Sequence, residues 1–216
     1  EESFQSPYLD GLNMDFEKIP QAAGKDYIQF LREMSVKCRN NGIILSVDNY
    51  VPSAYTSYYD RAEQGVLVDY VVTMAYDEHI NGGDGSGSVA SIGFVKDAVT
   101  NVLEEVPAEK NIIAIPFYTR LWEESAEGVT AKAYSMDQAQ IILDQNKAEA
   151  TWDNETMQYY AEYESGGNTY KVWLEEEKSL EEKLKVIMDN NVAGIASWKL
   201  GLEKSSVWSV ILKYVN

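Results

Sequence analysis

The stretch Asp10–Glu17, with the sequence DGLNMDFE, constrains the fold of this chain more than any other segment. Apolar and polar residues alternate through it. Because successive side chains of a β-strand point to opposite faces, the alternation predicts a strand with one apolar and one polar face. The bulky apolar face indicates burial under helices, which would leave the polar row in a partly enclosed space. Burying carboxylates is costly unless they are paired or used, so the row is a candidate functional site. It comprises Asn13, Asp15 and Glu17.

The composition sets limits on the partners of the chain. With 216 residues, 45% of them hydrophobic, the chain is long enough to bury one core. A formal charge of -17 argues against nucleic acid or an anionic membrane as the main partner. On this charge we expect no membrane partner, and the 216 residues contain neither a signal-peptide pattern nor an apolar run long enough to span a bilayer. The single cysteine, Cys38, excludes an intrachain disulfide, and its place in a helical pattern predicts a buried, inert thiol.

Strand and helix patterns alternate along the chain, which predicts an α/β fold with a parallel sheet. Aromatic residues among polar ones in residues 150–173 predict antiparallel strands inserted before the last helices. The expected strands are residues 8–16, 43–47, 67–74, 111–116 and 194–198, and the expected helices are residues 25–41, 89–105, 136–146, 180–190 and 205–215.

Four motifs, in order along the chain, carry a resemblance to glycoside hydrolase family 18. The first strand matches the family's D-G-x-D-x-D-x-E, with Asn13 where many members carry Asp. Met74–Asp77 matches M-x-Y-D, and residues 115–122 and 194–201 resemble the segments of the family's seventh and eighth strands. Residues 172–175 and 201–203 look most like the bacterial spore and cell-wall branch, whose members cleave peptidoglycan-type glycans.

The resemblance implies a (β/α)₈ barrel of the TIM type, incomplete here. On this alignment the chain holds strands four to eight, with residues 1–216 as a partial catalytic domain and residues 134–176 as an α+β insertion. Only seven residues precede the first strand, too few for another βα unit. An open sheet exposes its edges and an apolar inner face, so we expect homo-oligomer contact or rearranged packing to cover them.

The resemblance also implies hydrolysis of β-1,4-linked N-acetylglucosamine glycans, either peptidoglycan and spore cortex or chitin. In the substrate-assisted retaining mechanism the acetamido oxygen of the sugar attacks the anomeric carbon. Glu17 would be the general acid and then the base, Asp15 would hold the acetamido N–H, Tyr76 would bind the acetamido oxygen, and Asn13 completes the catalytic set. The substrate-binding residues implied are Asp10, Met74, Asp77, Tyr118, Arg120, Trp122 and Trp198. Residues 48–50 end the second strand and could reach the cleft, and their role is left open.

The spacing of the acidic row supports this chemistry independently. Asp15 and Glu17 are two residues apart on one face, roughly 7 Å between Cα atoms. Like charges this close push one pKa upward, which favours a protonated acid near neutral pH. Asn13 can only donate or accept hydrogen bonds, whereas an Asp there could take a proton. We therefore expect Asn13→Asp to alter the pH–rate profile more than substrate binding.

Two other functions remain open at this stage: a carbohydrate-binding protein that lost catalysis, and a fragment that is inactive although its parent is an enzyme. The intact Asp15, Glu17 and Tyr76 argue against the first. We expect no cofactor and no metal site, because one His, one Cys and scattered acids make no recognisable ligand set. The expected partner is a polysaccharide, and the expected location of the parent protein is extracellular, at the cell wall or spore.

Overall fold

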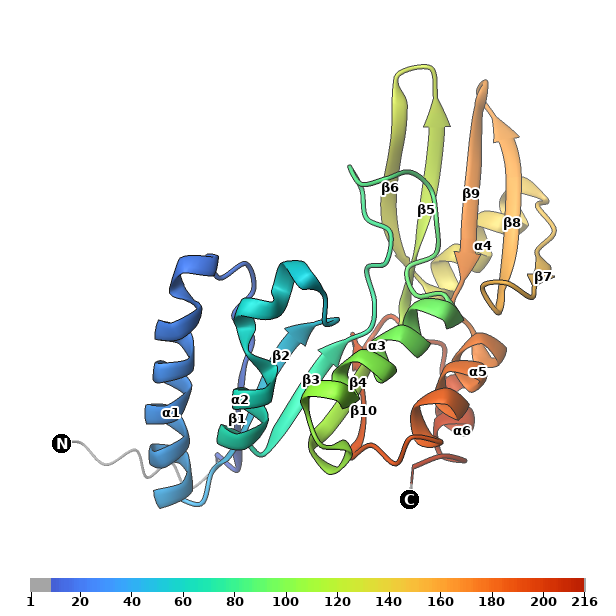
Figure 1. The fold of residues 1–216 in the computed structure, drawn as a ribbon. Helices are drawn as coiled ribbons and strands as arrows, with labels where there is room; N and C mark the ends of the chain where they lie inside the picture. Colours follow the sequence, from blue (N-terminus) through green and yellow to red (C-terminus); the bar gives the residue numbers. More distant parts are fainter. Residues whose placement is uncertain (1–8, 216) are drawn as a thin grey trace. The chain divides into compact units, whose positions relative to one another are not determined.

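The computed structural model describes residues 9–215, which fall into two compact units (Figure 1). The described part of unit 1 comprises residues 9–74, 98–113 and 191–194, and that of unit 2 comprises residues 75–97, 114–190 and 195–215. The first expected strand was to begin at Tyr8, which lies outside the described residues. Within residues 9–215, no helix is both long and apolar enough to cross a membrane.

Unit 1 is built on three parallel strands. β1 (Gly11–Met14), β2 (Ile44–Tyr50) and β3 (Tyr70–Met74) pair in the order β1-β2-β3. Leu45, Val47 and Val71 share one face of this sheet and are almost fully buried. This face forms the core, where α1 (Gly24–Asn40) contacts β2. Cys38 of α1 is buried as predicted, and burial raises the pKa of its thiol.

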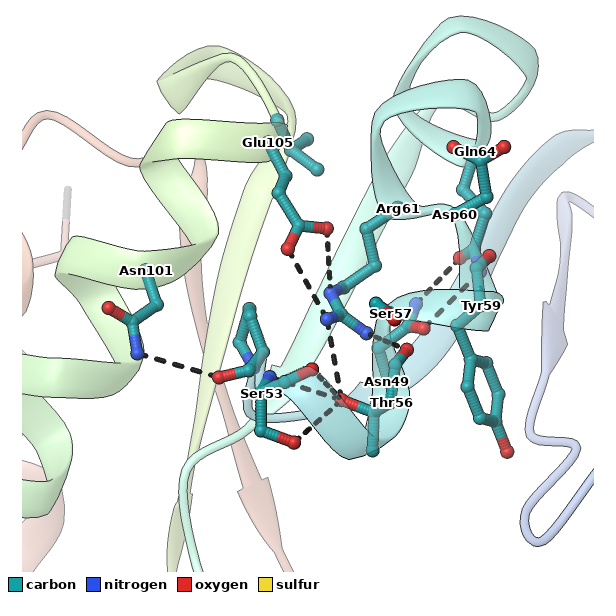
Figure 2. Close-up of polar contacts among 12 residues, drawn as sticks. Asn49, Ser53, Thr56, Ser57, Tyr59, Asp60, Arg61, Gln64, Asn101 and Glu105 are labelled. Carbon is teal, nitrogen blue, oxygen red and sulfur yellow. Dashed lines mark hydrogen bonds and ion pairs between the residues drawn. The ribbon is translucent and has the colours of Figure 1, made fainter. Parts of the chain in front are cut away.

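The β2–β3 connection contains two helices that the sequence patterns did not predict. They are the 3₁₀-helix η2 (Ala54–Tyr59) and α2 (Arg61–Leu67), so β3 starts three residues later than the expected strand at residue 67. Arg61 is completely buried, donates from Nη1 to the carbonyl of Thr56 at 3.0 Å, and pairs with Glu105 at 3.0 Å (Figure 2). Glu105 ends α3 (Ile92–Glu105). The contacts of Arg61 with Thr56 and with Glu105 therefore stabilise η2 and α2. Because these contacts are tertiary, the local sequence patterns did not predict the two helices.

A second buried polar contact ties the same connection to the sheet. Asn49 of β2 donates from Nδ2 to Oε1 of Gln64 on α2 at 2.6 Å (Figure 2). Gln64 in turn donates from Nε2 to the carbonyl of Tyr59 at 2.7 Å. Buried amides need partners, and these bonds supply them while closing η2 and α2 onto β2.

Unit 2 contains an antiparallel sheet with the strand order β6-β5-β9-β8-β7. Its helix α4 (Met136–Asn146) packs Ala139 and Leu143 against Ala161 and Val172 of the sheet. The strands are β5 (Tyr118–Ser125), β6 (Gly128–Ser135), β7 (Thr151–Asp153), β8 (Gln158–Ser165) and β9 (Asn168–Leu174), and the remaining helices are α5 (Glu177–Met188) and α6 (Val207–Ile211).

β4 (Asn111–Pro116) begins in unit 1 and ends in unit 2, and with β10 (Gly194–Trp198) it completes the five-stranded order β1-β2-β3-β4-β10. Two short 3₁₀-helices, η1 (Gln21–Ala23) and η3 (Ala108–Lys110), lie in the connections of unit 1.

The predicted α/β architecture, parallel strands plus an inserted antiparallel sheet, is confirmed in outline, and the bounds of β4, α4 and β10 match the expected ranges. Other extents differ. Antiparallel strands were expected in residues 150–173, but the sheet also contains the β5–β6 hairpin and so begins at Tyr118. The extent of the insertion, residues 134–176, stays a prediction. The last helix is shorter than residues 205–215. The numbering of the strands as four to eight of a barrel stays a prediction.

Candidate active site

The acidic row lies at the carboxyl end of β1 in unit 1. Asn13 is in the strand, and Asp15 and Glu17 follow it directly with exposed side chains. Asn13 donates from Nδ2 to Ser46 Oγ at 3.0 Å and to Asp48 Oδ1 at 2.9 Å. The register pairs Asn13 with Ser46, so the polar face of β1 continues onto β2. The alternation of the first strand therefore produced the polar face that the sequence predicted.

Glu17 has a direct partner on β2. The phenol of Tyr50 donates to Glu17 Oε2 at 2.8 Å. Burial, followed by the neighbouring Glu17 carboxylate, raises the pKa of Tyr50. The phenol consequently keeps its proton at ordinary pH and remains a donor to this carboxylate.

Three carboxyl groups influence one another at this end of the sheet. Burial raises the pKa of Asp15, and the charge of Glu17 raises it further. Burial also raises the pKa of Asp48; the Asn13 amide opposes this rise, while Asp15 and Glu17 add to it. The direction at Asp15 is the one expected for two like charges two residues apart.

A second polar group lies in unit 2, in the segment after β3 and on β5. Asp77 Oδ1 accepts a hydrogen bond from the Tyr118 phenol and a charged one from Arg120 Nη2 at 2.7 Å. The ring of Tyr76 meets Tyr118 edge to face, with centroids 6.3 Å apart. Asp77 has φ +59°, a conformation uncommon for a residue with a side chain, and its two bonds hold it there. The predicted residues Tyr76, Asp77, Tyr118 and Arg120 thus come together.

Two further predicted binding residues end their strands. Trp198 at the end of β10 is 51% exposed, and its carbonyl accepts from the Phe117 amide at 2.8 Å. Met74 at the end of β3 is 9% exposed. Trp198 therefore offers an open aromatic face, whereas Met74 offers little surface.

Two predicted substrate-binding residues do not lie where the sequence suggested. Asp10 directly precedes β1, whereas Glu17 lies in the turn that follows it, so the two residues lie beyond opposite ends of this strand. Trp122 is 1% exposed and donates from Nε1 to the carbonyl of Gly87 at 2.8 Å. A ring enclosed in this way offers little surface to a sugar, and the binding roles of Asp10 and Trp122 stay predictions.

Several residues at the site were not assigned by the sequence patterns. Ser46, Asp48 and Tyr50 alternate along β2 and share the polar face of Asn13 and Glu17. The alternation of polar residues along β2 could have indicated a polar face. The pairing of β2 with β1 was needed to show that this face adjoins the acidic row.

The structure also bears on the sole histidine and on metal binding. His79 Nδ1 lies 3.0 Å from the carbonyl of Ser88, a contact that ties a loop to itself. Among residues 9–215, no group of three or more His, Cys, Asp and Glu side chains is placed to hold a metal ion.

The sequence model described as Glycosyl hydrolases family 18 matches residues 2–203. The chain belongs to this family. The predicted resemblance is thereby confirmed.

Family 18 relatives of this chain include proteins named for spore cortex lysis. The chain is 30% identical over 214 residues to a cortical fragment-lytic enzyme of Bacillus subtilis (strain 168), a match covering 95% of this chain and 49% of the relative. The crystal structure of the Bacillus megaterium QM B1551 spore cortex-lytic enzyme SleL aligns with TM-score 0.86 at 25% identity, covering 96% of this chain and 49% of that one. A chitinase from Chromobacterium violaceum ATCC 12472 shares the fold, with TM-score 0.87, 24% identity, and coverage of 95% and 66%. The chain spans about half the length of the curated relatives it matches.

Proposed function

We propose that this chain provides the catalytic carboxylates of a glycosidase that cleaves β-1,4-linked N-acetylglucosamine glycans, with peptidoglycan-type glycan of spore cortex or cell wall preferred over chitin. The observation that carries the proposal is the Asp15–Glu17 pair at the carboxyl end of β1 in a chain of family 18. The names of the relatives favour the spore and cell-wall glycan.

The proposed reaction is substrate-assisted and proceeds with retention. Glu17 donates its proton to the leaving glycosidic oxygen as the acetamido carbonyl oxygen attacks C1 and the C1–O bond breaks. The Asp15 carboxylate accepts a hydrogen bond from the acetamido N–H and stabilises the positive charge of the oxazolinium intermediate. The Glu17 carboxylate then takes a proton from a water molecule as the water oxygen attacks C1. The bond between C1 and the acetamido oxygen breaks, which opens the oxazolinium ring, and Glu17 is again protonated.

Binding of the sugar is proposed for the residues of unit 2 and the strand ends. The half-exposed ring of Trp198 supplies a stacking face, since sugar rings present apolar C–H surfaces. Tyr76 donates to the acetamido oxygen, and Asp77, held by Tyr118 and Arg120, orients the ring hydroxyls.

The test is cleavage by the chain, by Glu17→Gln and by a control, Glu33→Gln, which changes an exposed glutamate of α1. Each protein is incubated with N-acetylglucosamine oligomers and with purified peptidoglycan, and products are identified by mass and by the anomeric proton signal. The proposal expects β-anomeric products from the chain and the control and none from Glu17→Gln. Binding without cleavage in all three proteins would contradict it and indicate a lectin-like fragment.

We also propose that the protein acts at the cell wall or spore. A second copy of the chain is proposed to cover the edge strand β1. β1 ends the strand order β1-β2-β3-β4-β10, and an edge strand presents unpaired backbone groups. Light scattering tests the contact between copies, and a monodisperse monomer that binds no apolar dye would contradict it.

A further inference from the structure

We propose that Tyr50, Tyr58 and Tyr59 form a tyrosine clamp that positions Glu17 for proton transfer. Tyr50 belongs to β2, and the other two end the 3₁₀-helix η2. In its catalytic consequence this inference rests on the function proposed above, because Glu17 is the acid of that reaction.

The clamp acts first on the side chain of Glu17. The Tyr50 phenol donates to Oε2 at 2.8 Å, which commits one carboxylate oxygen and fixes the rotation of the group. Tyr50 is itself fixed, since its ring meets Tyr59 edge to face with centroids 6.0 Å apart. Hydrogen bonds to a charged group are among the stronger ones, so this contact restricts a flexible, exposed glutamate.

The clamp acts next on the backbone around Glu17. The Tyr59 hydroxyl donates to the carbonyl of Phe16 at 3.3 Å and accepts from the amide of Ile19 at 3.2 Å. The Tyr58 hydroxyl donates to the carbonyl of Ile19 at 2.8 Å. Tyr59 therefore binds the chain on both sides of the turn that contains Glu17, and Tyr58 binds it on the far side.

That turn needs such support. Lys18 adopts φ +55°, which costs free energy for a residue with a side chain and persists only where surrounding contacts enforce it. Four described contacts support it: the three bonds of Tyr58 and Tyr59 to the backbone, and the backbone hydrogen bond of Lys18 to the Tyr50 phenol.

The clamp is anchored from behind by the buried polar network of the β2–β3 connection. Gln64 holds the carbonyl of Tyr59, and Arg61 holds the carbonyl of Thr56 while pairing with Glu105 (Figure 2). Figure 2 shows the bonds of Arg61 and Gln64 reaching η2 from α2, with Glu105 of α3 paired to Arg61. The position of Glu17 thus depends on residues that never approach the substrate, and a catalytic group misplaced by about 1 Å can cost on the order of 100-fold in rate.

The test uses hydroxyl deletions that keep the rings. Tyr50→Phe and Tyr59→Phe are compared with Tyr55→Phe, a matched control on η2 whose side chain is 91% exposed. We expect kcat to fall about tenfold or more in the first two, with KM within about twofold, and no change in the control. Two NMR signals report the contacts without activity: the side-chain carboxyl carbon of Glu17, identified by its loss in Glu17→Gln, and hydrogen exchange of the Ile19 amide.

The outcomes separate this inference from the proposed function. Tyr50→Phe should move the Glu17 signal, and Tyr59→Phe should speed exchange at Ile19, whether or not the chain cleaves glycan. If wild type cleaves and Glu17→Gln does not, but kcat in Tyr50→Phe equals wild type, the clamp is refuted and the function stands. If no protein cleaves and both NMR signals change, the function fails and the hold on the turn is supported; unchanged signals refute the clamp in either case.

Discussion

The buried pair of Glu175 and Lys183 in unit 2 gives a quantitative test of the electrostatics. Glu175 follows β9 and is 2% exposed, and Lys183 on α5 is 1% exposed. Lys183 Nζ donates to both carboxylate oxygens, at 2.9 and 2.8 Å. Ser179 and Gln158 donate to the same carboxylate at 2.9 and 2.8 Å. Such a satisfied pair is tolerated in the interior, but removal of one partner leaves an uncompensated charge.

The perturbation is Lys183→Met, which keeps most of the apolar stem and removes the charge. Burial raises the pKa of Glu175, and Lys183 is the first of the groups that oppose this rise. Without Lys183 the pKa rises further, so we expect the folded variant to hold Glu175 protonated at pH 7. The unfolded chain holds it ionised, with an ordinary pKa of 4.5.

The magnitude follows from that difference. Protonating a group 2.5 pH units above its ordinary pKa costs about 3.4 kcal/mol, at 1.36 kcal/mol per unit. At pH 5 only 0.5 unit remains, and the cost is about 0.7 kcal/mol. The folded variant binds more protons than the unfolded chain, so its stability falls as pH rises from 5 to 7. The pH 7 value agrees with the roughly 3–5 kcal/mol measured when buried pairs lose one partner.

The assay is urea unfolding of wild type and variant at pH 7 and pH 5, comparing the free energies of unfolding at each pH. Lys185→Met is the control, since Lys185 pairs with Glu182 on the exposed face of the same helix and should change stability by less than about 1 kcal/mol. The double variant Lys183→Met/Glu175→Gln should lose the pH dependence. A Lys183→Met loss under about 1 kcal/mol at pH 7, or an equal loss at both pH values, would refute the reasoning.

Three further predictions concern unit 1. Asn13→Asp places a second carboxyl against Asp48, so the pH profile of kcat/KM for glycan cleavage should shift while KM stays within about twofold. Tyr27→Phe removes a buried hydroxyl without a hydrogen-bond partner among the described residues, and it should raise the unfolding free energy by about 1 kcal/mol in urea titration. Gly24→Ala should destabilise by about 1–3 kcal/mol in the same titration, because its Cβ would lie 2.5 Å from the carbonyl oxygen of Tyr58.

Much of the fold was predictable where local pattern and tertiary environment agree. The apolar run of β4 and the capping box that starts α4 at Ser135 place both elements at their expected bounds. α2 was missed because its seven residues depend on the buried contacts of Arg61 and Gln64, which no local pattern shows. The β5–β6 hairpin was missed because β6 is largely exposed and depends on its pairing with β5.

The site divides in the same way. The alternation of Asn13, Asp15 and Glu17 was sufficient to predict one polar face at a strand end. The same motif match also brings Asp10 into the predicted site, although Asp10 precedes β1 and Glu17 follows it, and its role stays a prediction. Tyr58 and Tyr59 reach the Glu17 turn across about forty residues of chain, and only the folded connection shows their contacts.

The departure of Asn13 from the family motif makes physical sense once β2 is considered. The register of β1 and β2 places position 13 within hydrogen-bonding distance of Asp48. Two carboxylates at 2.9 Å could not both remain ionised, whereas an amide donates to the carboxylate and opposes the rise in its pKa. Asp48 therefore brings a third carboxyl to the row from the neighbouring strand, and the amide at position 13 lets it stay there. On this argument Asn13 and Asp48 act as a pair. Asn13→Asp alone should introduce repulsion between two carboxylates. Adding Asp48→Asn should remove that repulsion, because the amide and the acid exchange places across the same hydrogen bond.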